Sequence, residues 1–163
     1  MEAQHRDLIE KAKAEREHVK KHFARLKKSK AKDTDEIFHA KHEDFFKKND
    51  CLTCANCCKT TSPIFRDVDI KRISKQMKLK ESAFIASYLR RDEDGDYVLK
   101  SSPCKFLDTS DNTCRIYSFR PLACAEYPHT NRKNMLQILD LTALNAEICP
   151  AVASIVLNMI NSR

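Results

Sequence analysis

Cysteine is the residue type through which this sequence could do chemistry. Four thiols fall within eight positions in the run Cys51-Leu-Thr-Cys54-Ala-Asn-Cys57-Cys58, and four more follow at Cys104, Cys114, Cys124 and Cys149. An interval of three residues lets successive sulfur atoms converge on one point about a tight backbone turn. In a reducing compartment this cysteine content favours metal or redox chemistry over disulfides. We therefore expect all eight cysteines to ligate metal.

The spacing also predicts how the ligands divide. The pattern Cys-x2-Cys-x2-Cys matches the first three ligands of the bacterial ferredoxin run, whose fourth cysteine precedes a proline, as Cys149 precedes Pro150. Neighbouring side chains diverge by about 100° on a helix, so Cys57 and Cys58 are expected to serve different partners. One tetrathiolate site is then expected from Cys51, Cys54, Cys57 and Cys149, and a second from Cys58, Cys104, Cys114 and Cys124.

The kind of metal stays open at this point. Tetrahedral sulfur sites suit both zinc and iron–sulfur clusters. Three thiols at i, i+3 and i+6 favour a cluster, with [4Fe-4S] preferred, whereas structural zinc more often takes two C-x2-C pairs. Cations near the thiolates would offset their negative charge, and Lys105, Arg115 and Arg120 are candidates for that role as well as for ordinary surface positions.

The motifs around the cysteines carry a family resemblance. They are the run from Cys51 to Cys58, then Ser-Pro-Cys104-Lys-Phe-Leu, Cys114-Arg-Ile-Tyr-Ser-Phe-Arg120-Pro-Leu-Ala-Cys124-Ala-Glu-Tyr-Pro128, and Cys149-Pro. In this order, over about residues 42–152, the sequence resembles the YkgJ-type cysteine cluster family of bacterial zinc- or iron-chelating domains. A similar cluster occurs in flagellin lysine N-methylases. Ala55 departs from the family, which usually has glycine there, and Asn56 can adopt the left-handed conformation instead.

Other polar residues are candidates for supporting roles. Arg120, Tyr117 and Tyr127 lie in the family-like motif and are expected around the thiolates. The segment His39-Ala-Lys-His42-Glu43 places two imidazoles and a carboxylate near one face of a helix. With His129 they could form a secondary metal or proton-transfer site, or be solvated side chains of an exposed helix.

The elements that must position these residues begin with a basic N-terminal segment. Residues 5–30 predict one long amphipathic helix with a thin apolar stripe. Between positions 11 and 32 there are ten lysines and arginines, and the only acidic residues are Glu15 and Glu17. A second helix is expected after Asp33, ending before Cys51. We expect residues 1–48 to form a basic helical arm or hairpin that carries little of the core, and residues 49–163 to form the cysteine-cluster domain.

The remaining sequence predicts a mostly α-helical protein. Short helices are expected at 67–77, with Val68, Ile70 and Ile73 on the apolar side, and around 82–89. Asp94-Gly95 predicts a tight turn and at most a short hairpin. Pro150 suits the first turn of a final helix. The fold class is a small, irregular helical domain held together by cysteine-ligated metal.

Composition limits the possible functions. Gly95 is the single glycine of the sequence, which argues against a glycine-rich phosphate loop or dinucleotide fingerprint. The N-terminus lacks the apolar stretch of a secretory signal, and the most apolar tract, 148–160, is shorter than the roughly 20 residues of a membrane span. A cytoplasmic protein without membrane association is expected.

Three functions remain open. The leading one is a metal-binding protein with a redox, metal-handling or accessory role. The resemblance to the methylase cluster suggests, as an alternative, a metal-dependent modifying enzyme, so whether the protein is an enzyme stays open. The basic arm suggests an adaptor that binds an acidic protein surface, or, less favoured, nucleic acid.

Overall fold

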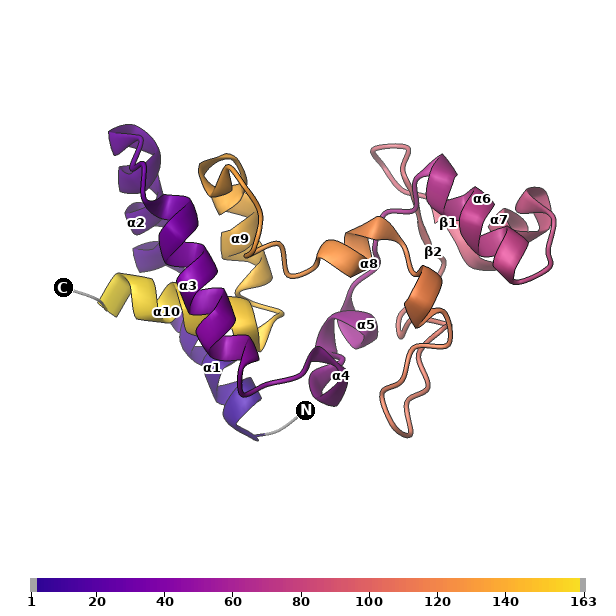
Figure 1. The fold of residues 1–163 in the computed structure, drawn as a ribbon, viewed down its shortest axis with the longest axis horizontal. Helices are drawn as coiled ribbons and strands as arrows, with labels where there is room; N and C mark the ends of the chain where they lie inside the picture. The colour runs from indigo at the N-terminus through magenta and orange to yellow at the C-terminus, as the bar shows by residue number, and fades with distance from the viewer. Residues whose placement is uncertain (1–2, 162–163) are drawn as a thin grey trace. The chain divides into compact units, whose positions relative to one another are not determined.

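The computed structural model describes residues 3–161, and the chain folds into two compact units (Figure 1). Of the described residues, unit 1 contains 3–54 and 128–161, and unit 2 contains Ala55–Tyr127. Within residues 3–161 the secondary structure is mostly helical, with one two-stranded antiparallel hairpin. The mostly α-helical class predicted from the sequence is confirmed.

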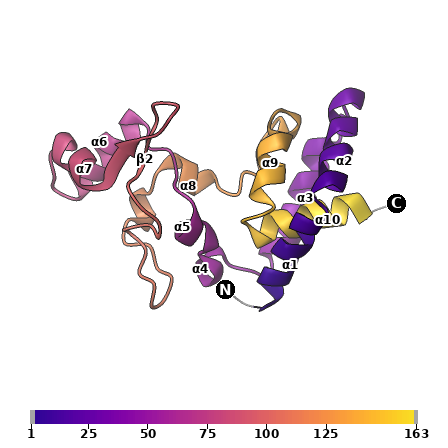
Figure 2. The ribbon, with the colours of Figure 1, turned by 180° about the vertical axis from the view of Figure 1, so that it is seen from behind.

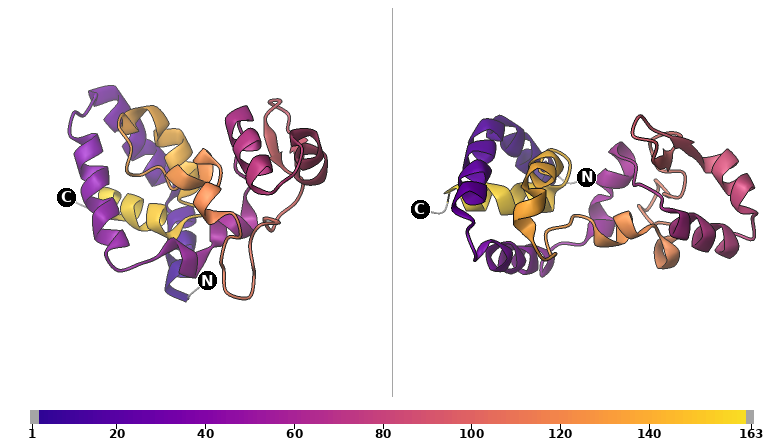
Figure 3. Two further views of the ribbon diagram at one scale, coloured as in Figure 1. Left: turned by 45° about the vertical axis from the view of Figure 1, so that its right-hand side comes forward. Right: turned by 90° about the horizontal axis from the view of Figure 1, so that it is seen from above.

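Unit 1 is a helical bundle built around its last helix. Its elements are α1 (Ala3–Ala14), α2 (Arg16–Ser29), α3 (Thr34–Phe46), α4 (Cys51–Cys54), the 3-10 helix η2 (Met135–Ile138), α9 (Leu139–Asn145) and α10 (Pro150–Asn161). Helices α1, α2, α3 and α9 all pack against α10, which appears in yellow among the indigo and purple helices in Figures 2 and 3. Burial of Val152, Ile155 and Val156 explains why α10 is apolar on most of its surface.

The N-terminal segment differs from its prediction in two respects. The expected single helix over 5–30 is interrupted at Glu15, which separates α1 from α2. Its apolar stripe also contributes more to the core than expected, because Ile9, Val19 and Phe23 are each at most 4% exposed. Phe23 lies beside Phe38 of α3, with ring centroids 6.3 Å apart. The N-terminal helices are therefore part of the hydrophobic core of unit 1.

Unit 2 combines short helices with the hairpin. Its elements are α5 (Asn56–Thr60), α6 (Asp67–Gln76), α7 (Glu81–Tyr88), β1 (Leu89–Arg91), β2 (Tyr97–Leu99), the 3-10 helix η1 (Tyr117–Phe119) and α8 (Leu122–Glu126). Its core is formed by Phe65, Ile70, Ile73, Phe84, Leu89, Leu99, Phe106 and Ile116. Val68 was predicted to share this face but is 59% exposed, because the buried side of α6 is set by Asp69, Ile70 and Ile73.

The hairpin confirms the turn predicted at Asp94-Gly95. Leu89 pairs with Leu99 and Arg91 with Tyr97. Gly95 has a φ of +83°, a conformation that glycine adopts without a Cβ penalty. The hairpin joins the preceding segment through the backbone N–H of Phe65, which donates to the carbonyl of Tyr97 at 2.8 Å. These contacts close the core on which two cysteines, Cys104 and Cys114, are packed.

Within residues 3–161, no single helix is long and apolar enough to cross a membrane. The helices Met135–Asn145 and Pro150–Asn161 reach that length and composition only together, and they are bent by 114° at their junction.

Candidate metal centre

The first cysteine run folds as two short helices joined by a strained residue. Asp50 directly precedes α4, and its side-chain carboxylate accepts the N–H of Leu52 at 2.9 Å. Ala55 follows Cys54 with φ +47° and ψ +21°, in the left-handed region, and α5 begins at the next residue. The residue in the left-handed conformation is therefore Ala55. The sequence had suggested Asn56 instead. An L-residue pays a steric penalty in this conformation, which explains why glycine suits the position.

Cys57 and Cys58 lie side by side on α5. A hydrogen bond from the Cys57 side chain holds the pKa of Cys58 below its ordinary value, against the opposing effect of burial. The positive charge of Lys59 lowers the same pKa further. The two neighbouring side chains of α5 therefore interact with each other.

Unit 2 brings Cys58 together with the three cysteines that follow it. The backbone N–H of Cys104 donates to the carbonyl of Cys58 at 2.8 Å, and Leu107 forms a β-bridge with Cys114. The next turn is closed by Tyr117, whose N–H donates to the carbonyl of Cys114 at 3.1 Å. Cys124 is on α8, where its N–H donates to Pro121 at 3.0 Å. Backbone hydrogen bonds thus fix the local geometry of each of these cysteine segments.

The thiols of unit 2 influence one another electrostatically. Burial, together with the charges of Cys58, Cys104 and Cys114, raises the pKa of Cys124 to about 12, and the charge of Arg120 opposes this rise. Burial and the neighbouring Cys58 also raise the pKa of Cys104 and of Cys114. Four thiolates in one neighbourhood repel one another, and a bound cation removes that repulsion.

Cys149 forms a second group with the cysteines of α4 in unit 1. Burial, together with the charges of Cys51 and Cys54, raises the pKa of Cys149 to about 12. Backbone N–H groups of Val152 and Ala151 lower the same pKa, because they donate hydrogen bonds to the sulfur at the beginning of α10. Pro150 occupies the first turn of that helix, as the sequence predicted.

The donor set suits a thiophilic metal or cluster. All eight cysteines are free thiols, and sulfur ligands of this number select zinc or iron–sulfur centres over hard cations. Backbone N–H groups that donate to sulfur, at Phe106 and Leu107 for Cys104, are typical of cysteine-ligated metal sites. Within residues 3–161, however, no three His, Cys, Asp or Glu side chains lie in the arrangement of a formed metal site.

The residues expected around the thiolates occupy the same part of unit 2. Arg120 stacks on Tyr117, with its guanidinium carbon 3.8 Å from the ring centroid, and donates to the Tyr117 carbonyl at 2.6 Å. Its charge lowers the pKa of both Cys114 and Cys124. Arg115 donates to the backbone carbonyl of Lys105 at 2.8 Å. Tyr127 is half-buried directly after α8.

The histidine candidates contact a loop of unit 1. Nε2 of His39 lies 2.8 Å from the carbonyl oxygen of Arg132, and Nδ1 of His42 lies 2.8 Å from Oγ1 of Thr130. Glu43 is exposed, and His129 begins the loop with a φ of +64°. These contacts give His39 and His42 a structural role in holding residues 130–132 against α3.

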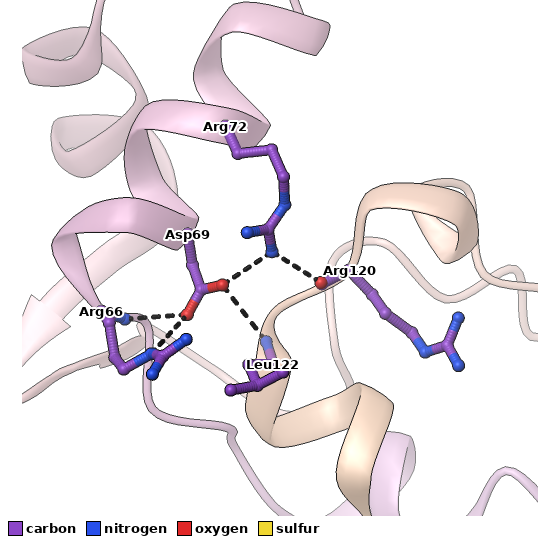
Figure 4. A network of polar contacts seen from close by, with 5 residues as sticks. All are labelled: Arg66, Asp69, Arg72, Arg120 and Leu122. Atoms are coloured by element: carbon purple, nitrogen blue, oxygen red, sulfur yellow. Dashed lines mark hydrogen bonds and ion pairs between the residues drawn. The ribbon is translucent and has the colours of Figure 1, made fainter.

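A buried carboxylate in unit 2 was not identified from the sequence. Asp69 is 0% exposed, and it accepts hydrogen bonds from Arg66, Arg72 and the backbone N–H of Leu122 (Figure 4). The sequence contained one local signal, an acid at the third position of α6 followed three residues later by arginine. The contact with Leu122 spans 53 residues and leaves no local pattern.

The comparisons with known proteins agree with this donor set. No solved structure matches the chain. Uncharacterized protein MJ0661 of Methanocaldococcus jannaschii is 28% identical over 82 residues, which cover 49% of this chain and 44% of that protein, so the match spans less than half of the relative. A family model, CxxCxxCC, described as "Putative zinc- or iron-chelating domain", matches residues 50–150. The chain therefore belongs to the CxxCxxCC family, as the spacing and context of its cysteines predicted.

Proposed function

We propose that this protein holds two metal centres through its eight cysteines, in a reducing cytoplasmic setting. One centre uses Cys58, Cys104, Cys114 and Cys124 of unit 2. The proposal is supported by the backbone contacts that bring the segments of Cys58, Cys104 and Cys114 together in unit 2, and by the electrostatic influence of these thiols on one another and on Cys124. The other centre uses Cys51, Cys54 and Cys149 of unit 1, where the charges of Cys51 and Cys54 raise the pKa of Cys149. Cys57 belongs to unit 2, where its side chain interacts with Cys58.

We propose [4Fe-4S] clusters in preference to zinc. The interval of three residues between Cys51, Cys54 and Cys57 supports a cluster, and so do the backbone N–H donors at Cys104 and Cys149. Bound clusters would supply one-electron redox chemistry. The chain would then serve in electron transfer, or as an accessory to a modification reaction, with its own residues binding and insulating the centres.

The test is metal analysis of serine variants. Protein purified anaerobically is analysed for iron, zinc and acid-labile sulfide, together with Cys114→Ser and with Thr109→Ala, an exposed position of the same segment, as a matched control. The proposal expects Cys114→Ser to lose about half of the metal and Thr109→Ala to keep all of it. Metal-free wild-type protein with a native fold would contradict it.

A second proposal concerns the outward face of α2. Residues 16–32 contain eight lysines or arginines and one glutamate, a formal charge of +7 that equals the net charge of the whole chain. Lys21, Arg25 and Lys28 are exposed at i, i+4 and i+7, opposite the buried Val19 and Phe23. We propose that this face binds an acidic surface of a partner protein.

Polyglutamate and duplex DNA serve as probes of this face. The proposal expects salt-sensitive binding of polyglutamate that is lost in the triple variant Lys21→Glu/Arg25→Glu/Lys28→Glu and kept in Lys71→Glu/Lys75→Glu of α6. Tighter binding of DNA than of polyglutamate at equal salt would favour nucleic acid and overturn the proposal.

A further inference from the structure

Asp69 carries a charge at a fully buried position of unit 2. Its side chain is 0% exposed, and burial of a carboxylate is costly unless donors surround it. Burial raises the pKa of Asp69, but hydrogen bonds from the Arg72 side chain and from the N–H groups of Leu122 and Arg66 outweigh this effect and hold the pKa below its ordinary value. The group is therefore an anion with a specific set of donors.

One of these donors belongs to the helix that carries a metal ligand. Helix α8 begins at Leu122, after Pro121. A proline side chain has no acceptor, so it cannot cap the first N–H groups of the helix as serine or aspartate would. Asp69, which lies on α6, supplies the missing acceptor: its Oδ1 accepts the N–H of Leu122 at 3.2 Å. Cys124 lies two residues further along α8.

Arg72 extends the contact to the other side of Pro121. Its Nη2 donates to Oδ1 of Asp69 at 2.6 Å and to the carbonyl of Arg120 at 2.9 Å. Asp69 thus binds the N–H after Pro121, and Arg72 binds the carbonyl before it (Figure 4). Arg66 contacts the opposite oxygen, Oδ2, through its N–H at 3.2 Å and its Nε at 3.4 Å, and does not take part in this arrangement.

We propose that Asp69, held by Arg72, is a positioning residue that fixes α8 and thereby the sulfur of Cys124 for metal binding. The inference rests on the proposed function, because it concerns the centre formed by Cys58, Cys104, Cys114 and Cys124. Residues that orient metal ligands typically change metal affinity about 10–100-fold when they are replaced.

Release of metal to excess chelator, followed in the full-length metal-loaded protein, tests this role. Two centres give two release phases, and the phase that disappears in Cys124→Ser is the one assigned to unit 2. Asp69→Asn keeps the volume of the side chain but removes its charge. Arg72→Leu removes the hydrogen bonds to Asp69 and to the carbonyl of Arg120. Both are expected to accelerate the Cys124 phase by about 10-fold or more and to leave the other phase unchanged.

Two control variants separate positioning from general destabilisation. Arg66→Leu removes the side-chain contact on Oδ2 alone and is expected to leave both phases at their wild-type rates. Ile73→Val lowers the thermal midpoint of unit 2 because it removes a buried methyl group from the core. This variant is also expected to release metal at the wild-type rate in both phases. Acceleration of the Cys124 phase by Ile73→Val, or wild-type rates in both Asp69→Asn and Arg72→Leu, would overturn the inference. A wild-type protein without bound metal, or a Cys124→Ser variant with both phases, would instead overturn the proposed function.

Discussion

The backbone N–H of Cys104 donates a hydrogen bond to the carbonyl oxygen of Cys58 at 2.8 Å. This contact joins the first cysteine run to the second ligand segment of unit 2 through the main chain. The segment after Cys104 is fixed in turn, because the N–H of Leu107 donates to the carbonyl of Cys104 at 3.0 Å. Backbone hydrogen bonds therefore fix part of the arrangement of Cys58 and Cys104.

Single serine variants of the first run should affect different centres. Cys58→Ser is expected to remove the centre of unit 2, and Cys54→Ser the centre that includes Cys149. Each variant should retain about half of the wild-type metal, because a tetrathiolate site rarely survives loss of one ligand. Metal content and visible spectra of both variants provide the measurement. Identical spectra and identical metal loss in the two variants would show that the division into two groups is wrong.

Helix α2 should be required for the stability of unit 1. Phe23 is 2% exposed, so Phe23→Ala should lower the free energy of unfolding by about 3–5 kcal/mol through lost burial and a residual cavity. Lys21→Ala, two residues away on the exposed face, should change it by less than about 0.5 kcal/mol. Denaturant unfolding followed by circular dichroism makes the comparison. Equal effects of the two variants would mean that α2 is only an appended arm.

The parts of the structure that sequence reasoning predicted are those with local causes. The hairpin follows from Asp94-Gly95, and the start of α10 follows from Pro150. The family was predicted because the spacing and context of the cysteines are local sequence patterns. By contrast, Glu15 lies among good helix formers, so the break between α1 and α2 has no local signal.

The missed features of the candidate site depend on contacts between distant residues. Asp69 reaches Leu122 across 53 residues, and a helical pattern around Asp69 cannot reveal that partner. Ala55 shows the same limitation, since its own conformational preference disfavours the left-handed region in which the structure places it. Local preference pointed to Asn56, which instead begins α5.

Ala55→Gly should stabilise the protein. Glycine has no Cβ penalty at a φ of +47°, so the variant should gain about 1 kcal/mol. Ala24→Gly is the matched control, because the same change inside α2 should cost about 0.8–1 kcal/mol. Thermal unfolding of both variants in the metal-loaded state measures the two effects. A loss of stability in Ala55→Gly would contradict the strain assigned to this residue.

His42 should make unit 1 less stable in mild acid. Burial holds the pKa of His42 below its ordinary value of 6.5, the nearby His39 lowers it further, and Glu43 opposes them. Protonation therefore favours the unfolded chain. The stability linked to His42 is complete above about pH 6.5 and is lost as the pH falls from there toward the lower folded-state pKa. The contact with Oγ1 of Thr130 and the ring of Phe46, 4.6 Å away, surround the same imidazole.

The measurement is the thermal midpoint of wild type and His42→Gln at pH 7.5 and pH 5.5. Protonation of the cysteine ligands affects both proteins alike, so the difference between them isolates His42. Wild type is expected to lose more stability than the variant over this interval. Parallel losses would rule out His42 as the titrating group.

The central claim is that eight cysteines hold two metal centres, and the most direct measurement is the content of iron, zinc and acid-labile sulfide per chain after anaerobic purification. Two [4Fe-4S] clusters predict a brown protein with about eight iron and about eight sulfide per chain. About two zinc ions per colourless chain would retain the two centres and replace the cluster assignment. Less than one metal per folded chain, with all eight thiols reacting freely with a thiol reagent, would contradict the claim.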